Sequence, residues 1–382
     1  MRFSIPITSE RKFSIVTRLT RCIRISGLLA TLAFLPGCST FGYYMQSMHG
    51  QWQVLSARRP IAEVVADQSQ PPKLRTQLQT IQEMRRFAVD QLQLPDNRSY
   101  TSYSDIKRRF VITNVFATPE LSLTPVRSCF PFVGCLDYRG YFRNDMARHY
   151  AAELRAKGLD VYVGDVAAYS TLGWFDDPVL NSMLNWDEAK LAKFLFHELA
   201  HQQLYVKNDT AFNEAFAESV ALEGLKRWWR HHPDAPSIQK LREEEYRESA
   251  FIDLVLQTKR QLQAIYDSSA VDEEKRARKR EALDSFRQRY LELKKQWRGY
   301  AGYDAWVNDH LNNAKIAAVV TYNDLIPAFR ALLRIAHGQL PGFYALAARI
   351  GERAAAERRQ CLAALMQQAG ASAPDCLAKL PP

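Results

Sequence analysis

Beyond residues 1–37, the chain has no apolar run of the ~18 residues that a transmembrane helix needs. It has no internal repeat, and none of its 6 cysteines forms the Cys-x-x-Cys pair of a zinc knuckle. The sequence therefore excludes a helical membrane span in this part and gives no sign of a knuckle-type zinc domain. The 382 residues are 47% hydrophobic and 24% charged, which is an ordinary globular balance and enough for two domains or one large one.

The positive charge of the chain is smaller than its formal value suggests. The sequence has 51 Lys and Arg against 41 Asp and Glu, a formal net charge of +10. Six of these basic residues and one acidic residue lie in residues 1–37, so the remainder has 45 basic and 40 acidic residues, a net charge of +5. Because this excess is spread over predicted helices instead of being clustered, we expect no nucleic-acid partner.

Residues 1–37 have the features of a signal peptide. A basic segment precedes a short apolar run, Gly27 to Leu35, which is too short to cross a bilayer. The run ends in Leu35-Pro36-Gly37-Cys38, which resembles the lipobox of bacterial lipoproteins. The resemblance implies cleavage before Cys38, lipidation of its thiol and, from the non-acidic Ser39, the periplasmic face of the outer membrane in preference to the inner membrane. The alternative is an ordinary cleaved signal followed by an incidental cysteine.

The four remaining cysteines fit export to an oxidising compartment, where an even number favours disulfides. Because each pair is close in sequence, we expect Cys129 to join Cys135 and Cys361 to join Cys376. Metal binding and free buried thiols remain as alternatives.

Hydrophobic periodicity predicts an α+β fold that is predominantly helical. Apolar residues recur at helical spacing over 57–95, interrupted at Pro71-Pro72. β-Branched and aromatic residues predict strands at 109–116 and 160–166. Residues 41–52 are aromatic and irregular.

Three other segments have distinct patterns. We expect a loop to hold Cys129 and Cys135. Residues 238–297 are dense in charged side chains with apolar positions between them, which indicates a helical hairpin that turns near Asp267. Residues 169–175 could form an edge strand that pairs with an extended peptide.

A metal-binding pattern lies in His197-Glu198-Leu199-Ala200-His201. Residues four apart lie on one face of a helix, so both imidazoles can bind one zinc ion. Glu198 points toward a water on that metal and is the candidate general base. A structural alternative is that these histidines are packed core residues, but packing does not explain buried carboxylates close together without a cation.

Twelve residues after His201 the chain has Asn213-Glu214-Ala215-Phe216-Ala217-Glu218. Together with the first motif, this resembles the gluzincin metallopeptidases. The resemblance implies that Glu214 is the third zinc ligand and that Glu218 accepts a hydrogen bond from a ligand histidine. The linker is shorter than the usual gluzincin one, so a tight loop at Lys207–Thr210 must join the two helices.

The chain also resembles the predicted aminopeptidase family of bacterial lipoproteins, through the lipobox, Tyr169–Trp174 and Asn213–Glu218. The expected organisation is a signal peptide (1–37), an N-terminal helical and strand region (38–165), a zincin catalytic core with a small mixed sheet (166–237), the charged hairpin (238–298) and a C-terminal helical region that completes the site (299–382). The resemblance implies a membrane-anchored zinc peptidase that hydrolyses peptides with one zinc ion per chain.

One catalytic group remains to be assigned. Gluzincins often use a downstream Tyr or His to stabilise the oxyanion, which leaves Tyr300, Tyr303 and Tyr322 as candidates. Tyr322 is preferred because polar groups gather around it between apolar segments, and packing of a tyrosine in a helix is the alternative. A second hypothesis for the chain is a non-catalytic zinc-binding envelope lipoprotein that binds a partner through its helical hairpin. The intact Glu198 argues against it, since a structural site needs no general base.

Overall fold

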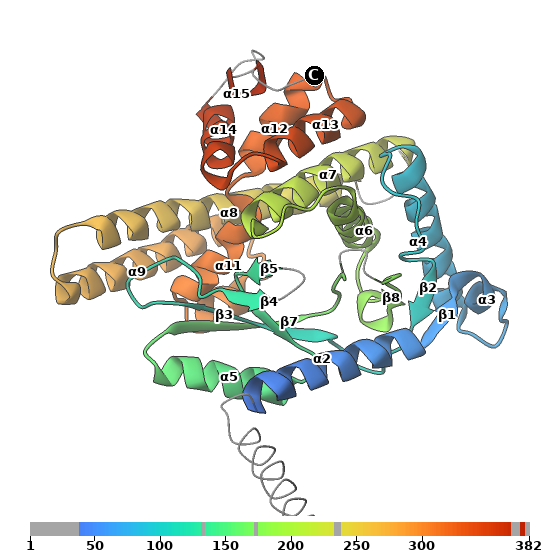
Figure 1. The fold of residues 1–382 in the computed structure, drawn as a ribbon, viewed down its shortest axis with the longest axis horizontal. Helices are drawn as coiled ribbons and strands as arrows, with labels where there is room; N and C mark the ends of the chain where they lie inside the picture. Colours follow the sequence, from blue (N-terminus) through green and yellow to red (C-terminus); the bar gives the residue numbers. More distant parts are fainter. Residues whose placement is uncertain (1–37, 131–133, 172–174, 233–237, 368–374, 379–382) are drawn as a thin grey trace, which may run out of the picture. The chain divides into compact units, whose positions relative to one another are not determined.

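The computed structural model describes residues 38–130, 134–171, 175–232, 238–367 and 375–378 (Figure 1). The predicted signal peptide lies outside these residues, and so does the side chain of Cys38. The chain divides into two compact units, Met1–Gln51 and Trp52–Pro382. The described helices include none that is both long and apolar enough for a membrane span.

The fold is predominantly helical with small sheets, as predicted. The helices are α2 (Cys38–Ser56), α3 (Ile61–Ala66), α4 (Pro72–Asp90), α5 (Asn144–Ala156), α6 (Glu188–Gln203), α7 (Thr210–His231), α8 (Ile238–Asp267), α9 (Asp272–Gln296), α10 (Asp304–Asn308), α11 (Asn313–Asn323), α12 (Ile326–Ile335), α13 (Leu340–Gly351), α14 (Ala355–Gln367) and α15 (Asp375–Ala378), with a short 3-10 helix η1 (Asn181–Met183). The strands are β1 (Arg58–Pro60), β2 (Ser102–Ser104), β3 (Ile112–Thr118), β4 (Ser128–Phe130), β5 (Gly134–Leu136), β6 (Arg139–Tyr141), β7 (Asp160–Val166) and β8 (Val179–Leu180).

Helix α2 corrects one expectation, because residues 41–52 were predicted to be irregular. The segment has no proline, and its Met and Gln residues are good helix formers. Its two glycines, Gly42 and Gly50, each weaken a helix by only about 1 kcal/mol. Aromatic composition alone was therefore a poor guide here.

An antiparallel sheet of order β6-β3-β7 lies between α5 on one face and α11 on the other (Figure 1). Strand β7 has the predicted bounds, and β3 begins three residues later than expected. Helix α11 also packs against α7 and α8. The sheet is thereby connected through one helix to the part of the fold that holds the two histidines.

Two smaller sheets complete the described strands. Strands β1 and β2 are antiparallel, and β8 pairs in parallel with β2. Strands β4 and β5 form a hairpin where a loop was expected, with Cys129 opposite Cys135. A disulfide joins these two cysteines and another joins Cys361 to Cys376, which is the pairing expected from sequence proximity.

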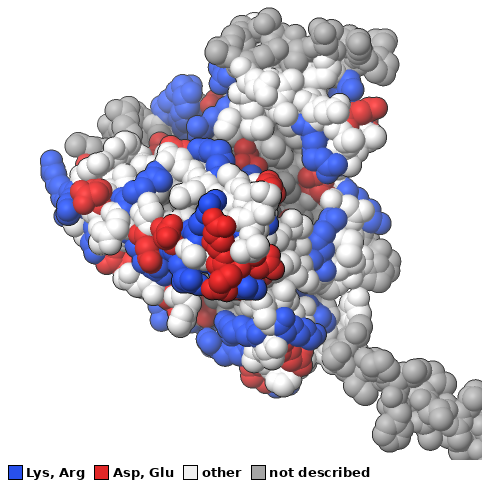
Figure 2. Space-filling model, turned by 90° about the vertical axis from the view of Figure 1, so that its left-hand side faces the viewer, with Lys and Arg blue, Asp and Glu red and all other residues white. Residues whose placement is uncertain are grey.

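Helices α8 and α9 form the predicted charged hairpin, with the turn at residues 268–271. The apolar positions between the charges, among them Leu262 and Phe286, are buried in a cluster with α10 and α11. Acidic and basic side chains alternate over the face of the molecule seen in Figure 2, so neither sign forms a continuous patch on that face. Most charged side chains of the hairpin are exposed or half-buried, as the pattern indicated, whereas Lys279 is buried and pairs with Asp160 at 2.7 Å.

Candidate metal centre

Helix α6 begins where the sequence provides a cap. The Asp187 carboxylate accepts a hydrogen bond from the Lys190 amide at 2.9 Å. Leu191, Leu195 and Leu199 are buried along one side of the helix. Since His197 and His201 lie on the side that faces α7, burial of the apolar side determines the direction of both imidazoles.

Helices α6 and α7 approach each other closely at Gly224. A Cβ atom there would lie 2.6 Å from Leu92 Cδ1 and 2.8 Å from Phe196 Cδ2, both closer than atoms can pack. The glycine is therefore required by the short distance between α7 and its neighbours. Nearer the start of α7, Glu214 faces the two histidines of α6.

Asn213, which precedes the candidate ligand Glu214, holds the linker between α6 and α7. Its side chain accepts a hydrogen bond from the Val206 amide at 2.7 Å and donates one to the Val206 carbonyl at 2.8 Å. Asp209 caps α7 by accepting from the Phe212 amide at 3.1 Å, and it also pairs with Arg358 at 2.7 Å. These bonds connect the short linker to the start of α7 and so position the next residue, Glu214.

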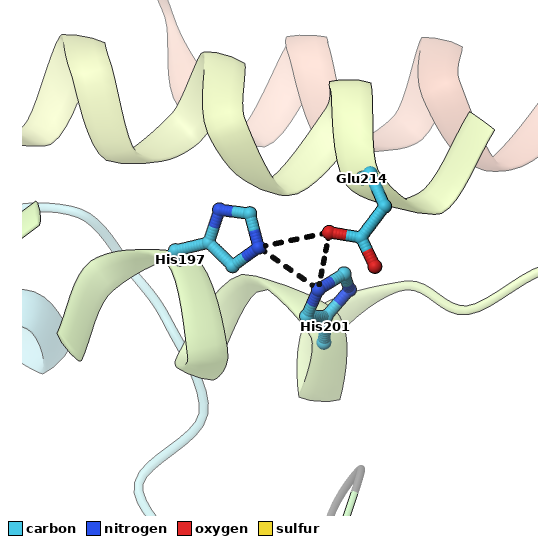
Figure 3. A group of neighbouring side chains, drawn as sticks. All are labelled: His197, His201 and Glu214. Carbon is cyan, nitrogen blue, oxygen red and sulfur yellow. Dashed lines mark hydrogen bonds and ion pairs between the residues drawn. The ribbon is translucent and has the colours of Figure 1, made fainter. Parts of the chain in front are cut away.

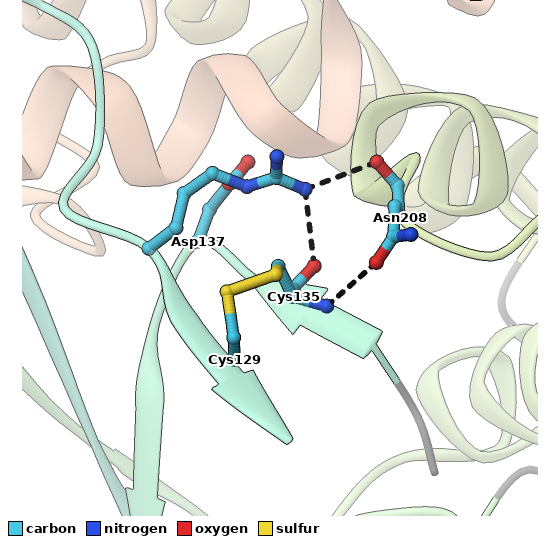
Figure 4. Close-up of a disulfide and its surroundings, with 5 residues drawn as sticks. Cys129, Cys135, Asp137 and Asn208 are labelled. Carbon is cyan, nitrogen blue, oxygen red and sulfur yellow. Dashed lines mark hydrogen bonds and ion pairs between the residues drawn. A yellow bond between two sulfur atoms is a disulfide. The ribbon is translucent and has the colours of Figure 1, made fainter. Parts of the chain in front are cut away.

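The disulfide hairpin supports the same linker (Figure 4). The Asn208 side-chain oxygen accepts a hydrogen bond from the Cys135 amide at 2.9 Å, and the Asn208 backbone carbonyl accepts one from Arg127 at 3.0 Å. Asn208 has a positive φ of 66°, a conformation that asparagine tolerates better than most residues. The tight loop predicted at Lys207–Thr210 is therefore held by hydrogen bonds with the β4–β5 hairpin and with the start of α7.

His197, His201 and Glu214 point toward one another (Figure 3). The Nε2 atoms of the two histidines are 3.1 Å apart. The Glu214 Oε2 atom lies 3.2 Å from His197 Nε2 and 3.6 Å from His201 Nε2. The predicted ligands thus form one cluster that could hold a metal ion.

These separations fit a tetrahedral zinc site. Zinc ligands at ~2.0–2.1 Å from the ion and at tetrahedral angles lie about 3.3–3.4 Å from each other. The three observed separations, 3.1, 3.2 and 3.6 Å, scatter around that value. The donor set of two imidazoles and one carboxylate is also one that catalytic zinc sites use.

The pKa values of the cluster residues are shifted in the directions expected for carboxylates and imidazoles that surround one positive charge. Burial opposes the charge on His197, but hydrogen bonds with Glu214 and Glu218 raise the pKa of His197 to about 10. Burial likewise opposes the charge on Glu214, but the two histidines lower its pKa to about 2. In the absence of a metal a proton on His197 takes the place of the cation, and a metal must displace that proton to bind.

Glu218 lies behind His197, where the resemblance placed it. Its Oε2 atom is 3.3 Å from His197 Nδ1, and its Oε1 atom is 2.7 Å from the ammonium of Lys193. Lys193 also contacts Glu248 of α8 at 3.1 Å. Burial raises the pKa of Glu218, but Lys193 and His197 outweigh it and lower the value to about 2. Glu218 is therefore ionised and can orient the imidazole ring.

Glu198, the candidate general base, is partly exposed. Burial of its carboxylate raises its pKa, while the two ligand histidines and a hydrogen bond with Ser170 lower it. The same environment contains Tyr100 and Asp177, which interact electrostatically with Glu198. Sequence reasoning missed Ser170, Tyr100, Asp177 and Lys193, because no fixed spacing from the motif marks them.

Two other expectations concerned an edge strand at residues 169–175 and a tyrosine that stabilises the oxyanion. Residues 169–171 are not a strand, because Asp177 holds Ser170 and Thr171 in a loop through hydrogen bonds of 2.8–3.1 Å, and residues 172–174 lie outside the described part. Tyr322 belongs to α11, but its side chain is outside the described residues. Of the other two candidates, Tyr303 stacks on Phe251, and Tyr300 lies under the Arg247 guanidinium.

Residues 42–362 match the model of the family described as "Putative aminopeptidase". The chain belongs to this family. The match includes both helices of the metal centre, and membership indicates a peptidase. No curated protein and no solved structure matches the chain.

Proposed function

We propose that this family member is a zinc-dependent aminopeptidase of the gluzincin type, anchored to the bacterial cell envelope by a lipid on Cys38. The observation that supports it best is the arrangement of His197, His201 and Glu214, whose ligand atoms have the separations of a three-ligand zinc site. Three protein ligands leave a position for water, whereas a structural zinc site has four protein ligands. Zinc bound here would lower the pKa of that water toward ~7 and polarise the substrate carbonyl.

The residues of the chain have separate tasks in this reaction. Glu198 removes a proton from the attacking water as the water oxygen bonds to the peptide carbonyl carbon. The same carboxyl group then gives the proton to the leaving nitrogen as the C–N bond breaks, which releases a carboxylic acid and an amine. Glu218 keeps the Nδ1 proton of His197 in place, so that Nε2 faces the metal.

The alternative is a non-catalytic zinc lipoprotein that binds a partner through α8 and α9. The presence of Glu198 next to His197 favours the enzyme, because a purely structural site needs no general base. The proposal also includes a zincin-like catalytic core and a location at the outer membrane.

A paired peptide library tests the function. Each peptide is supplied with a free and with an acetylated N-terminus, and products are identified by mass spectrometry after incubation with the zinc-loaded protein. We expect release of the first residue from the free peptides only, loss of cleavage with a zinc chelator and recovery when zinc is restored. Cleavage inside acetylated peptides would show an endopeptidase. Zinc binding without cleavage of any peptide would support the non-catalytic lipoprotein.

A further inference from the structure

Helix α2 has a concentration of large apolar side chains that are exposed. Phe41, Met48 and Trp52 are 69%, 67% and 64% exposed, and Tyr44 and Met45 are 39% and 49% exposed. Five of the twelve exposed large apolar side chains among the described residues therefore belong to this one helix. A single exposed apolar residue is ordinary on a protein surface, whereas a contiguous group of them indicates a contact site.

These five side chains lie on the same side of the helix. At 3.6 residues per turn, their positions fall within an arc of about 100°, and at 1.5 Å per residue they extend over about 16 Å. Tyr43, Gln46 and Val54 lie on the opposite side and are buried. We call the exposed row the apolar stripe, which consists of Phe41, Tyr44, Met45, Met48 and Trp52.

The helix that bears the apolar stripe contains no charged side chain. Residues 38–57 include no Asp, Glu, Lys or Arg, although these residues make up 24% of the chain. The first charged residues are Arg58 and Arg59, which follow the end of α2. An uncharged segment can enter the boundary of a bilayer without the cost of removing water from an ion. Tyr and Trp, both present in the stripe, are the side chains enriched at membrane–water interfaces.

Only one side of α2 is apolar, which suits a helix that lies along a membrane surface. The other positions include polar residues such as Gln46, Ser47 and Gln53. A helix with one apolar side lies in the plane of the lipid–water boundary, with that side about 5–10 Å deep. The apolar stripe therefore has the form of an interfacial helix.

The position of Cys38 indicates which partner the stripe meets. Helix α2 begins at Cys38, and Phe41 follows three residues later, so both lie within one helical turn. In the proposed function Cys38 has the lipid, and its acyl chains enter the bilayer beside the first turn of α2. Such a tether keeps the stripe at a high effective concentration near the lipid surface. A phospholipid surface is thus the partner that the stripe meets first.

We propose that the apolar stripe of α2 lies in the lipid–water boundary of the membrane that holds the Cys38 lipid. The protein then has two anchors, a covalent lipid and the interfacial helix that follows it. This inference rests on the lipid anchor of the proposed function and does not depend on the zinc site. A second copy of the chain is the alternative partner for the stripe, and the test distinguishes the two.

The test uses tryptophan fluorescence of the protein isolated from bacterial membranes. The protein is reconstituted into vesicles of phosphatidylethanolamine and phosphatidylglycerol with brominated acyl chains, because bromine quenches only nearby tryptophans. We expect Trp52 to be quenched, so Trp52→Phe should lose the quenched part of the emission. Trp186→Phe, which changes a half-buried tryptophan elsewhere in the chain, should keep it.

A charged variant of the stripe tests its contact with lipid while the lipid tether stays in place. Met45→Glu/Met48→Glu retains good helix formers but sets two negative charges against the anionic lipid, so quenching should fall to the level of Trp52→Phe. The matched control is Val271→Glu/Leu291→Glu, which changes two exposed apolar side chains of the α8–α9 hairpin region. The control should leave the quenching unchanged.

Mass spectrometry of the same samples separates this inference from the proposed function, because it shows whether Cys38 has acyl chains. Equal quenching in wild type and Trp52→Phe, with Cys38 lipidated, would overturn the inference and leave the lipid anchor intact. An unquenched Trp52 in a dimer that Met45→Glu/Met48→Glu dissociates, measured by light scattering in detergent, would assign the stripe to a second copy. A Cys38 without acyl chains would overturn the lipid anchor. In that case quenching of Trp52 would still support the interfacial helix, and its absence would overturn it.

Discussion

Replacing Asn213 by alanine should destabilise the protein strongly, although the change removes only one side chain. Asn213 is 2% exposed and makes two hydrogen bonds, to the amide and to the carbonyl of Val206. The substitution leaves both backbone groups without these partners. An unsatisfied buried group costs about 1–3 kcal/mol, and because Val206 is half-buried the loss in the free energy of unfolding for its two groups should lie in the lower part of roughly 2–6 kcal/mol.

Urea denaturation followed by circular dichroism measures this loss in the metal-free protein. Asn213→Asp keeps an acceptor for the Val206 amide but sets an oxygen against the Val206 carbonyl, so it should also destabilise. Asn144→Ala is the control, because this exposed asparagine bonds to Thr113 without covering a backbone group, and its loss should stay under about 1 kcal/mol. A loss as small for Asn213→Ala as for the control would refute the role of Asn213 in holding the linker.

Three further predictions concern other parts of the chain. Zinc affinity should rise with pH through the neutral range by about tenfold per pH unit, because His197 has a pKa of about 10 and zinc must displace its proton. Calorimetry between pH ~6 and ~9 measures this affinity, and a value that does not change with pH would contradict the prediction. Lys193→Met should lower the free energy of unfolding by about 3 kcal/mol, since it removes one of the two basic groups that face the largely buried Glu218 carboxylate, and a loss near zero in urea denaturation would show that Glu218 does not need the lysine. Cys38→Ala should abolish incorporation of a labelled fatty acid, and equal label in mutant and wild type would exclude Cys38 as the lipidation site.

Much of the metal centre could be predicted from the sequence because its residues lie at fixed local spacings. His197 and His201 are one helical turn apart, and Glu214 and Glu218 repeat that spacing on the next helix. The cysteine pairs were predictable for a similar reason, because a short intervening segment keeps the two cysteines of each pair close in space. The capped start of α6 and the hairpin of α8 and α9 follow from local signals as well.

The residues that surround the motif were not predictable, because contacts distant in sequence bring them there. Tyr100 and Ser170, whose charges or hydrogen bonds influence the pKa of groups around Glu198, precede it by 98 and 28 residues in the chain. Lys193 lies close to the motif, but its importance depends on Glu218 and Glu248, which tertiary packing supplies. The strand predicted at 169–175 is wrong for residues 169–171, because the pattern does not show that Asp177 holds Ser170 and Thr171 in a loop.

The most direct test of the account compares zinc content and peptide hydrolysis in Glu198→Gln and Glu214→Ala. Glu214 is proposed as a ligand, so Glu214→Ala should lose both zinc and activity. Glu198 is proposed as the base, so Glu198→Gln should keep about one zinc ion per chain and lose at least ~10²–10⁴-fold in turnover. Elemental analysis and the free-peptide assay give both values for each variant. Loss of zinc from Glu198→Gln together with its retention by Glu214→Ala would contradict the assignment of ligand and base.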